Sequence, residues 1–253
     1  MRKIIKKLLV GTRLESPAKR LQAQIRRARR EIAGTDEKII REYLKQQKTR
    51  KLHLGCGAHV LDGWLNTNVF TESHLVARMD ATKPYPLDDD AFDYAFSEHM
   101  VEHISYEQGE QMFKECFRVL RDKGTIRITT PDLSFLIDLY RSDKTDLQKK
   151  YIRWAAETFW QRVPFPEDTF VINNFMRDWG HVFIYDEKTL RASLERAGFK
   201  EIVRCNLNES EHEALRDLEN EEKMPEGFLK LESLSLEGTK RAPADDSRST
   251  GIL

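Results

Sequence analysis

Two glycines stand where a ligand site is expected, in the run Gly55-Cys56-Gly57. Leu52 and Leu54 alternate with polar neighbours just before them, a pattern that predicts a short strand. Glycine lets the backbone take a positive φ angle, or lets a ligand approach it closely. Ligands of open α/β sheets bind beyond the carboxyl ends of the strands. The strand and its glycine turn therefore predict a site for a nucleotide-like ligand.

Three histidines are candidates to take a proton from a reacting group: His99, His103 and His181. An imidazole titrates near neutral pH, which suits a general base. His99 comes just beyond a predicted strand, and His181 follows Trp179-Gly180 at the end of an aromatic-rich stretch. A structural histidine is an equally good interpretation of each, so the sequence leaves the identity of the base open.

Short strands and helices alternate along most of the chain. Strands are predicted at 52–54, 64–68, 75–79, 91–96, 125–129, 199–205 and 228–238, and helices at 35–48, 106–122, 135–140, 147–161 and 186–197. This alternation is typical of an α/β fold with a doubly wound, mostly parallel sheet. The last predicted strand carries leucine pairs that are out of phase across Glu232-Ser233, so it requires a bulge or a break there.

The stretch 133–185 interrupts the alternation as a helical and aromatic insert. Over the carboxyl edge of a sheet, its aromatic side chains could shape a substrate pocket. They could equally form ordinary core.

Charge is divided unevenly along the chain. The net formal charge is zero, but residues 1–50 hold 16 Lys and Arg against 5 Asp and Glu. We therefore predict a basic helical arm at 1–48, a main domain at 49–240 and a disordered tail at 241–253. The amphipathic start, 1–10, could dock on the protein or on a second copy of it, lie on an anionic membrane surface, or be a solvated face. Nucleic-acid binding through the arginine-rich 24–30 is the least favoured interpretation.

The location of the protein is predicted from what the sequence contains. No apolar run approaches the roughly 20 residues that span a bilayer. The cysteines Cys56, Cys116 and Cys205 show no pairing or metal-ligand spacing, which favours free thiols in a reducing compartment. We expect a cytoplasmic protein, with peripheral contact at the inner membrane surface as an option.

Several motifs, taken in order, resemble the class I S-adenosylmethionine-dependent methyltransferases, and most nearly the methyltransferase type 11-like family. These motifs are Leu52-His53-Leu54-Gly55-Cys56-Gly57, Gly63-Trp64-Leu65-Asn66, Asp80-Ala81, Phe92-Asp93 and Glu102-His103, followed by the stretch from Tyr185 to Phe199. The resemblance implies a Rossmann-like methyltransferase fold with seven strands and S-adenosylmethionine as cofactor. It further implies methyl transfer to a small-molecule, sugar or lipid-linked acceptor, with O-methylation favoured.

The resemblance also implies where the cofactor binds. The glycine turn would pass close to its methionine part, where backbone N–H groups can bind a carboxylate. The second strand ends in Asn68, whereas this family usually has an acid there for the ribose hydroxyls; an amide can still donate and accept hydrogen bonds. Asp80 and Ala81 would hold the adenine amino group. The predicted cofactor-binding residues are Gly55, Cys56, Gly57, Asn68, Asp80, Ala81, Ser97 and Glu98.

A metal ion is held in some methyltransferases by a Glu-x-x-Glu-His run. Here His99 stands where the first Glu of that run would be, and Glu98 is one residue too early. The sequence therefore predicts no metal site, and Glu102-His103 is interpreted as the start of a helix against the sheet.

Two other classes of function stay open. A nicotinamide-dependent dehydrogenase would have a third glycine at the turn, where this chain has His59, and an acid in place of Asn68. A methyltransferase-like scaffold without catalysis, using its basic arm for partner contacts, is the second alternative.

Overall fold

The computed structural model describes residues 17–141, 143–160 and 165–241. The strands are β1 (Lys51–Leu54), β2 (Leu65–Asn68), β3 (Ala77–Arg78), β4 (Phe92–Glu98), β5 (Leu120–Pro131), β6 (Lys200–Cys205) and β7 (Ser233–Thr239). The α-helices are α2 (Pro17–Ile32), α3 (Thr35–Gln46), α4 (Tyr106–Val119), α5 (Leu133–Leu139), α6 (Asp146–Phe159), α7 (Asp168–Arg177), α8 (Glu187–Ala197) and α9 (Phe228–Glu232). Short 3-10 helices are η1 (Val101–His103), η2 (Glu213–Leu215) and η3 (Glu221–Lys223).

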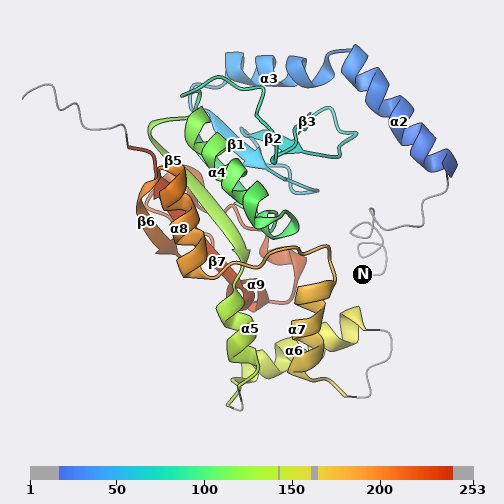
Figure 1. The fold of residues 1–253 in the computed structure, drawn as a ribbon, viewed down its shortest axis with the longest axis vertical. Helices are drawn as coiled ribbons and strands as arrows, with labels where there is room; N and C mark the ends of the chain where they lie inside the picture. The colour runs from blue at the N-terminus through green and yellow to red at the C-terminus, as the bar shows by residue number, and fades with distance from the viewer. Residues whose placement is uncertain (1–16, 142, 161–164, 242–253) are drawn as a thin grey trace, which may run out of the picture.

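The centre of the molecule is a seven-stranded sheet in the order β3-β2-β1-β4-β5-β7-β6 (Figure 1). The first five strands run parallel, and β7 runs antiparallel to both β5 and β6. The predicted mostly parallel α/β sheet is confirmed. Because parallel strands end at the same edge, the sheet brings the glycine turn after β1 next to the end of β4.

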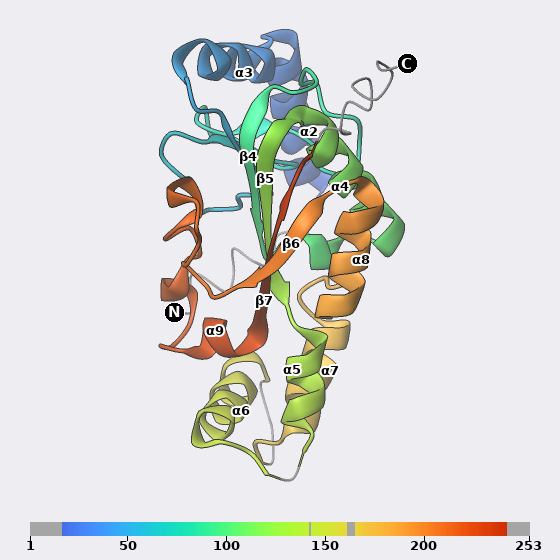
Figure 2. The same cartoon turned by 90° about the vertical axis from the view of Figure 1, so that its left-hand side faces the viewer.

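The two faces of the sheet differ in character. In β5, Ile126 and Ile128 lie in the main apolar core, whereas Arg127 between them is buried among polar groups. Successive residues of a strand point to opposite faces, so β5 has an apolar side and a polar side. Phe96, which pairs with Arg127, packs on the polar side in a second, smaller apolar cluster with Trp64, Leu215 and Leu218. Figure 2 shows α4 and α8 on one side of the sheet and the segment between β6 and β7 on the other. Leu234 and Leu236 of β7 continue the apolar face.

Two predicted elements differ from the structure at their ends. The predicted last strand is a helix, α9, followed by β7, and the change from helical to strand period explains the phase break at Glu232-Ser233. The predicted helix 106–122 ends at Val119, because the chain becomes extended at Leu120, where β5 begins to pair with β4 opposite Phe92. The third strand is shorter than predicted, with two residues.

The part of the arm that the structure describes rests on the main domain. Gly34 takes a φ of 56° and separates α2 from α3. Arg30 donates to the carbonyls of Ser73 and Val76, 2.8 and 2.6 Å away, and Ile40 packs in the main core. The stretch 1–10 lies outside the described residues. Within the described ranges, no helix combines the length and apolarity that crossing a membrane requires.

The insert forms a core of its own. Phe135, Tyr151, Phe175 and Phe228 are buried together, so much of the aromatic content serves packing. In Figure 1, α5, α6 and α7 stand beyond the carboxyl ends of the parallel strands, away from α2 and α3. The insert therefore lies over the edge where a ligand is expected.

Candidate active site

The glycine turn has the backbone that its residue types predict. Gly55 and Gly57 have φ angles of 65° and 55°, and the N–H of Cys56 donates to Thr67 O at 2.9 Å. A β-carbon at Gly57 would meet no atom within 4 Å, whereas one at Gly55 would meet Met100 Cγ at 2.2 Å. Gly55 thus allows Met100 to pack on the turn, and Gly57 faces open space.

Asp80 follows Met79 in the loop after β3, close to the end of β2. The N–H of Met79 donates to Asn68 O at 3.1 Å, which joins this loop to the end of β2. Asp80 Oδ1 accepts hydrogen bonds from the backbone N–H and the hydroxyl of Thr82, at 2.9 and 2.7 Å. Asp80 therefore shapes its own turn with one carboxylate oxygen and leaves the other for a ligand. Ala81 is half-buried beside it.

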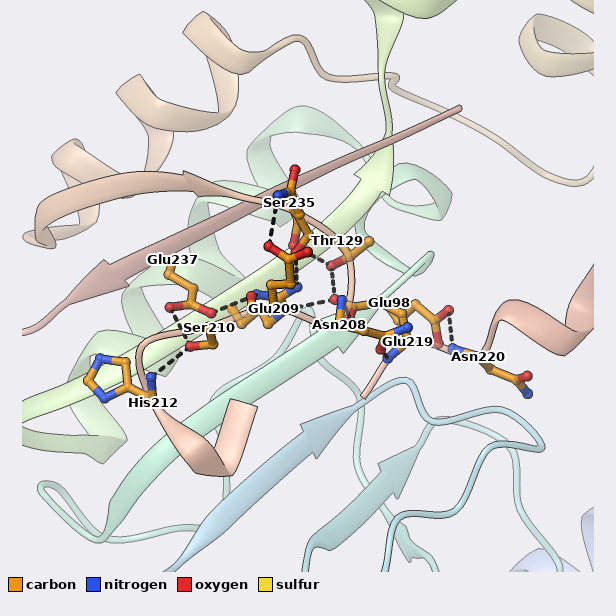
Figure 3. A network of polar contacts seen from close by, with 12 residues as sticks. Glu98, Thr129, Asn208, Glu209, Ser210, His212, Glu219, Asn220, Ser235 and Glu237 are labelled. Carbon is orange, nitrogen blue, oxygen red and sulfur yellow. Dashed lines mark hydrogen bonds and ion pairs between the residues drawn. The ribbon is translucent and has the colours of Figure 1, made fainter. Parts of the chain in front are cut away.

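Ser97 and Glu98 at the end of β4 are both buried but differ in their partners. Ser97 Oγ has no hydrogen-bond partner among the described residues. Glu98 Oε1 accepts from the N–H of Asn220 at 3.1 Å and lies 2.8 Å from Lys223 Nζ (Figure 3). His59 Nδ1 lies 3.4 Å from Glu98 Oε2 without hydrogen-bond geometry. The segment between β6 and β7 thus occupies Glu98 and leaves Ser97 unpartnered.

The three predicted histidines meet around Glu102. The Glu102 side chain is fully buried, and its Oε2 accepts a hydrogen bond from Thr130 Oγ1 at 3.1 Å. Its Oε1 lies 3.5 Å from His99 Nδ1 and 3.9 Å from His103 Nε2, and it has no hydrogen bond. The ring centroids of His103 and His181 are 5.1 Å apart. We call Glu102, His99, His103 and His181 the histidine cluster.

Each histidine of the cluster is oriented by a second contact. His181 Nδ1 is 2.9 Å from Phe175 O, so it donates to that carbonyl and leaves Nε2 as an acceptor. His103 bonds to the backbone of Gly180 and has Nδ1 on that side, so its Nε2 faces Glu102. His99 has a φ of 46° and places Nε2 2.9 Å from Ser233 Oγ.

Burial keeps the cluster neutral. It lowers the pKa of His99 to about 3 and that of His181 to about 4, and raises the pKa of Glu102 to about 8. The pKa of His103 is lowered as well, mainly by burial. At neutral pH the imidazoles are therefore unprotonated, the form in which a general base acts.

Sequence reasoning did not identify Glu102, Ser233 or Glu232 as members of this site. Glu232 is buried next to Ser233, accepts a hydrogen bond from Tyr151 OH, and has its pKa raised to about 7 by burial. The Glu102-His103 pair gave a local signal for Glu102. Ser233 and Glu232 gave none, because they come from a distant part of the chain.

One family of domains matches this part of the chain. Residues 58–128, from just after the glycine turn to β5, match the family described as "Methyltransferase domain". The match covers less than half of the chain and supports the resemblance found in the sequence. The resemblance to the class I S-adenosylmethionine-dependent methyltransferases and the predicted fold class are confirmed, and S-adenosylmethionine is the methyl donor of this class.

The solved structures that are similar to this chain are distant. A SAM dependent methyltransferase from Archaeoglobus fulgidus is 16% identical, with 83% of this chain and 94% of that chain covered and a TM-score of 0.45. A possible histamine N-methyltransferase from Thermotoga maritima is 15% identical, with 86% of this chain and 96% of that chain covered and a TM-score of 0.45. Phosphoethanolamine N-methyltransferase 2 from Haemonchus contortus is 14% identical, with 83% of this chain and 53% of that chain covered and a TM-score of 0.43. The chain therefore spans about half of that protein. No curated protein matches the chain. Nothing about the acceptor follows from likeness this distant.

The residues around the glycine turn fit S-adenosylmethionine, the cofactor of the class that the chain resembles. The open space beside Gly57 admits a ligand close to the backbone. Ser97 Oγ is buried and unpartnered, and one oxygen of Asp80 is left to accept a hydrogen bond. A ligand with polar groups at both ends would give Ser97 Oγ and the second oxygen of Asp80 hydrogen-bond partners.

Proposed function

We propose that this methyltransferase transfers a methyl group to a hydroxyl oxygen of a small-molecule, sugar or lipid-linked acceptor. The observation that supports it is the meeting of His99, His103 and His181 around the unpartnered oxygen of Glu102. The cluster begins one residue beyond Glu98, where β4 ends. A proton acceptor therefore lies next to the site in which the methyl donor is expected.

The cofactor residues are assigned from the turn outward. Bound S-adenosylmethionine supplies a methyl group already activated on its sulfonium, so the protein positions the acceptor and excludes water. In our proposal the amides of the glycine turn and Ser97 hold the methionine end. Asn68 takes the ribose hydroxyls, and Asp80 with Ala81 takes the adenine amino group.

His181 and His103 are better placed as the base than His99. Both leave Nε2 free, because their Nδ1 sides face backbone partners. Either can accept the proton of the acceptor hydroxyl as the new oxygen–carbon bond forms. His99 has Nε2 against Ser233 and Nδ1 toward Glu102, so we assign it the positioning of Glu102.

An apolar groove in the insert supports an acceptor with an apolar part. The groove has a volume of about 360 Å³ and lies between α5 and α7. Its lining residues are Leu133, Leu136, Ile137, Tyr140, Thr169, Ile172, Asn173 and Met176. Because α7 also carries the carbonyl of Phe175 that orients His181, the groove and the base are held by the same helix.

The basic surface of the arm lies on α2. Arg26, Arg27 and Arg29 are exposed on α2 while Arg30 anchors it. We assign this basic surface to contact with a second copy of the chain or to peripheral contact at the inner membrane surface of a cytoplasmic protein. Removal of residues 2–34 should change the oligomeric state or the membrane recovery. Nucleic acid is not an expected partner.

Calorimetric titration with S-adenosylmethionine tests the enzyme proposal. Asp80→Ala removes the adenine acceptor, and Gly57→Val fills the open space beside the turn. Each should abolish binding while the circular dichroism of the sheet is unchanged. Asp62→Ala, at an exposed position near the turn, is the matched control and should bind like the wild type.

Turnover distinguishes the enzyme from the scaffold alternative. Formation of S-adenosylhomocysteine with a panel of hydroxylated acceptors should be detected and should fall in His181→Ala. Absence of cofactor binding in the wild type, or unchanged affinity in both site variants, refutes the proposed site. Binding without turnover on any acceptor favours a scaffold.

A further inference from the structure

The geometry points to a metal site: Glu102, His103 and His181 bind a divalent transition-metal ion. One ligand atom from each residue, a carboxylate oxygen and two imidazole nitrogens, lies within 4.8 Å of the others. In the ranges that the structure describes, this is the one group of His, Cys, Asp and Glu side chains with such spacing. The site deepens the proposed function and rests on it for its role in catalysis. With the ion bound, His103 and His181 act as ligands instead of as the base, and the acceptor hydroxyl, made more acidic by the ion, would lose its proton to water.

An unpartnered oxygen points into the centre of this group. Glu102 Oε1 is buried without a hydrogen bond, while Oε2 is held by Thr130. Leaving a buried polar atom unpaired costs about 1–3 kcal/mol. A cation at this position removes that cost, because it binds the oxygen directly.

The two imidazoles are oriented as metal-ligating histidines usually are. A ligating histidine typically donates its other ring N–H to a carbonyl or carboxylate, which fixes the tautomer. His181 donates through Nδ1 to Phe175 O, and His103 faces the backbone of Gly180 with Nδ1. Both Nε2 atoms are thus free to coordinate. His99 and Thr130 contact the carboxylate from outside.

The donor set selects the class of ion. Imidazole suits zinc, copper, iron and nickel, whereas magnesium and calcium prefer oxygen ligands. Metal–ligand distances are about 2.0–2.2 Å, so two ligand atoms on one ion are at most about 4.4 Å apart. Glu102 Oε1 and His103 Nε2 are already 3.9 Å apart. The other two pairs lie within 4.8 Å, so small side-chain rotations would bring all three atoms into range, and the His103 side chain, 39% exposed, has room to rotate.

Three protein ligands leave coordination positions open. Catalytic zinc sites have this composition, with water or substrate in the open position. An oxygen of the acceptor in that position would be held next to the end of β4, and coordination would make its hydroxyl more acidic. Such a site favours acceptors with a hydroxyl group over amines that have no oxygen donor.

Metal binding is tested on the full chain without cofactor or acceptor. After treatment with a chelator and its removal, Zn²⁺ and Co²⁺ are titrated by calorimetry, and bound Co²⁺ is followed by its visible absorption. One ion should bind per chain. Glu102→Gln, which keeps the bond to Thr130, His103→Ala and His181→Ala should each weaken binding by more than the about 10–100-fold that loss of an outer-shell partner costs. His74→Ala, at an exposed histidine outside the group, is the control.

The results separate this inference from the proposed function. Stoichiometric binding that is lost in the three ligand variants and kept in His74→Ala supports the metal site. Failure of Zn²⁺ and Co²⁺ to bind the wild type, or equal binding in all variants, overturns it. Cofactor titration in the presence of a chelator is read independently. Cofactor binding and chelator-resistant turnover without a metal would refute the metal site and leave the methyltransferase proposal standing.

Discussion

Two buried polar groups lie on opposite faces of β5, and they differ in how many of their polar atoms have hydrogen-bond partners. On the polar face, Arg127 is fully buried and donates to Glu219 Oε1 at 2.7 Å and Glu237 Oε1 at 2.6 Å. Its remaining donors reach the carbonyls of Asn206 and Glu209, both at 2.9 Å. On the apolar face, Glu102 has one hydrogen bond and one unpartnered oxygen.

The difference indicates which group is structural. Figure 3 shows Glu219, Glu237 and Thr129 joined in one network with the segment between β6 and β7. Burial opposes the charge of Arg127, but its bonds to Glu219 and Glu237 outweigh that and raise its pKa. Every group there has a partner within the protein. In the histidine cluster the side chains are held in place, but Glu102 Oε1 has no hydrogen-bond partner. A bound ligand or ion would provide that partner.

The largest expected effect on stability is that of Arg127→Met. The change leaves two buried carboxylates without their cation, and breaking a buried pair costs about 3–5 kcal/mol. Urea unfolding at neutral pH should show a loss of this size. Addition of Glu219→Gln and Glu237→Gln to the same chain should recover part of it, because the uncompensated charges are then removed. A loss below about 1 kcal/mol would contradict a structural role for the network.

The next effect concerns His53, which lies on the polar face and bonds through Nδ1 to Asn66 Oδ1 at 2.9 Å. Burial lowers its pKa to about 4, from an ordinary value of about 6.5. Between these two values the unfolded chain binds a proton that the folded chain excludes, so stability falls as pH falls through this window. The full contribution is at most about 3 kcal/mol, at 1.36 kcal/mol per pKa unit.

His53→Gln isolates this contribution. The free energy of unfolding, measured at neutral pH and near pH 4.5, should drop less on acidification in the variant than in the wild type. Other groups titrate in the same window, but they are common to both proteins and cancel in the difference. Equal acid sensitivity would show that His53 is not kept neutral by burial.

The sequence predicted the glycine turn and the α/β class of the sheet, because these depend on local patterns. It named His99, His103 and His181 only as candidate bases. It did not predict that the histidines meet. His181 reaches the other two only when the insert folds back over the sheet edge. Arg127 likewise finds Glu219 and Glu237 at sequence separations of 92 and 110 residues. The helix α9 was interpreted as strand because its five residues are too few to establish a period.

Arg30 provides a surface counterpart to Arg127. It also reaches two carbonyls and one carboxylate, but only Asp36 is charged, and both side chains are partly exposed at 11% and 20%. Arg30→Ala leaves no fully buried charge, so we expect a loss of about 1.5 kcal/mol, the low end for hydrogen bonds to charged groups. Hydrogen exchange should speed up in residues 73–78 and stay unchanged in β5. A loss as large as that of Arg127→Met would mean that burial of the charge does not decide the cost.

The expected change in stability that has the opposite sign, a gain, is that of Glu102→Gln. The pKa of about 8 means that the folded chain holds a proton that the unfolded chain releases above about pH 4.5, so wild-type stability falls as pH rises through this window. Glutamine keeps the acceptor for Thr130 and needs no proton. With a chelator present, the variant should be more stable at neutral pH by up to about 3 kcal/mol, at 1.36 kcal/mol per pKa unit, with the gain growing toward pH 8. Its turnover, measured without the chelator, should be lost. Lower stability together with full turnover would make the cluster a second structural network like that of Arg127.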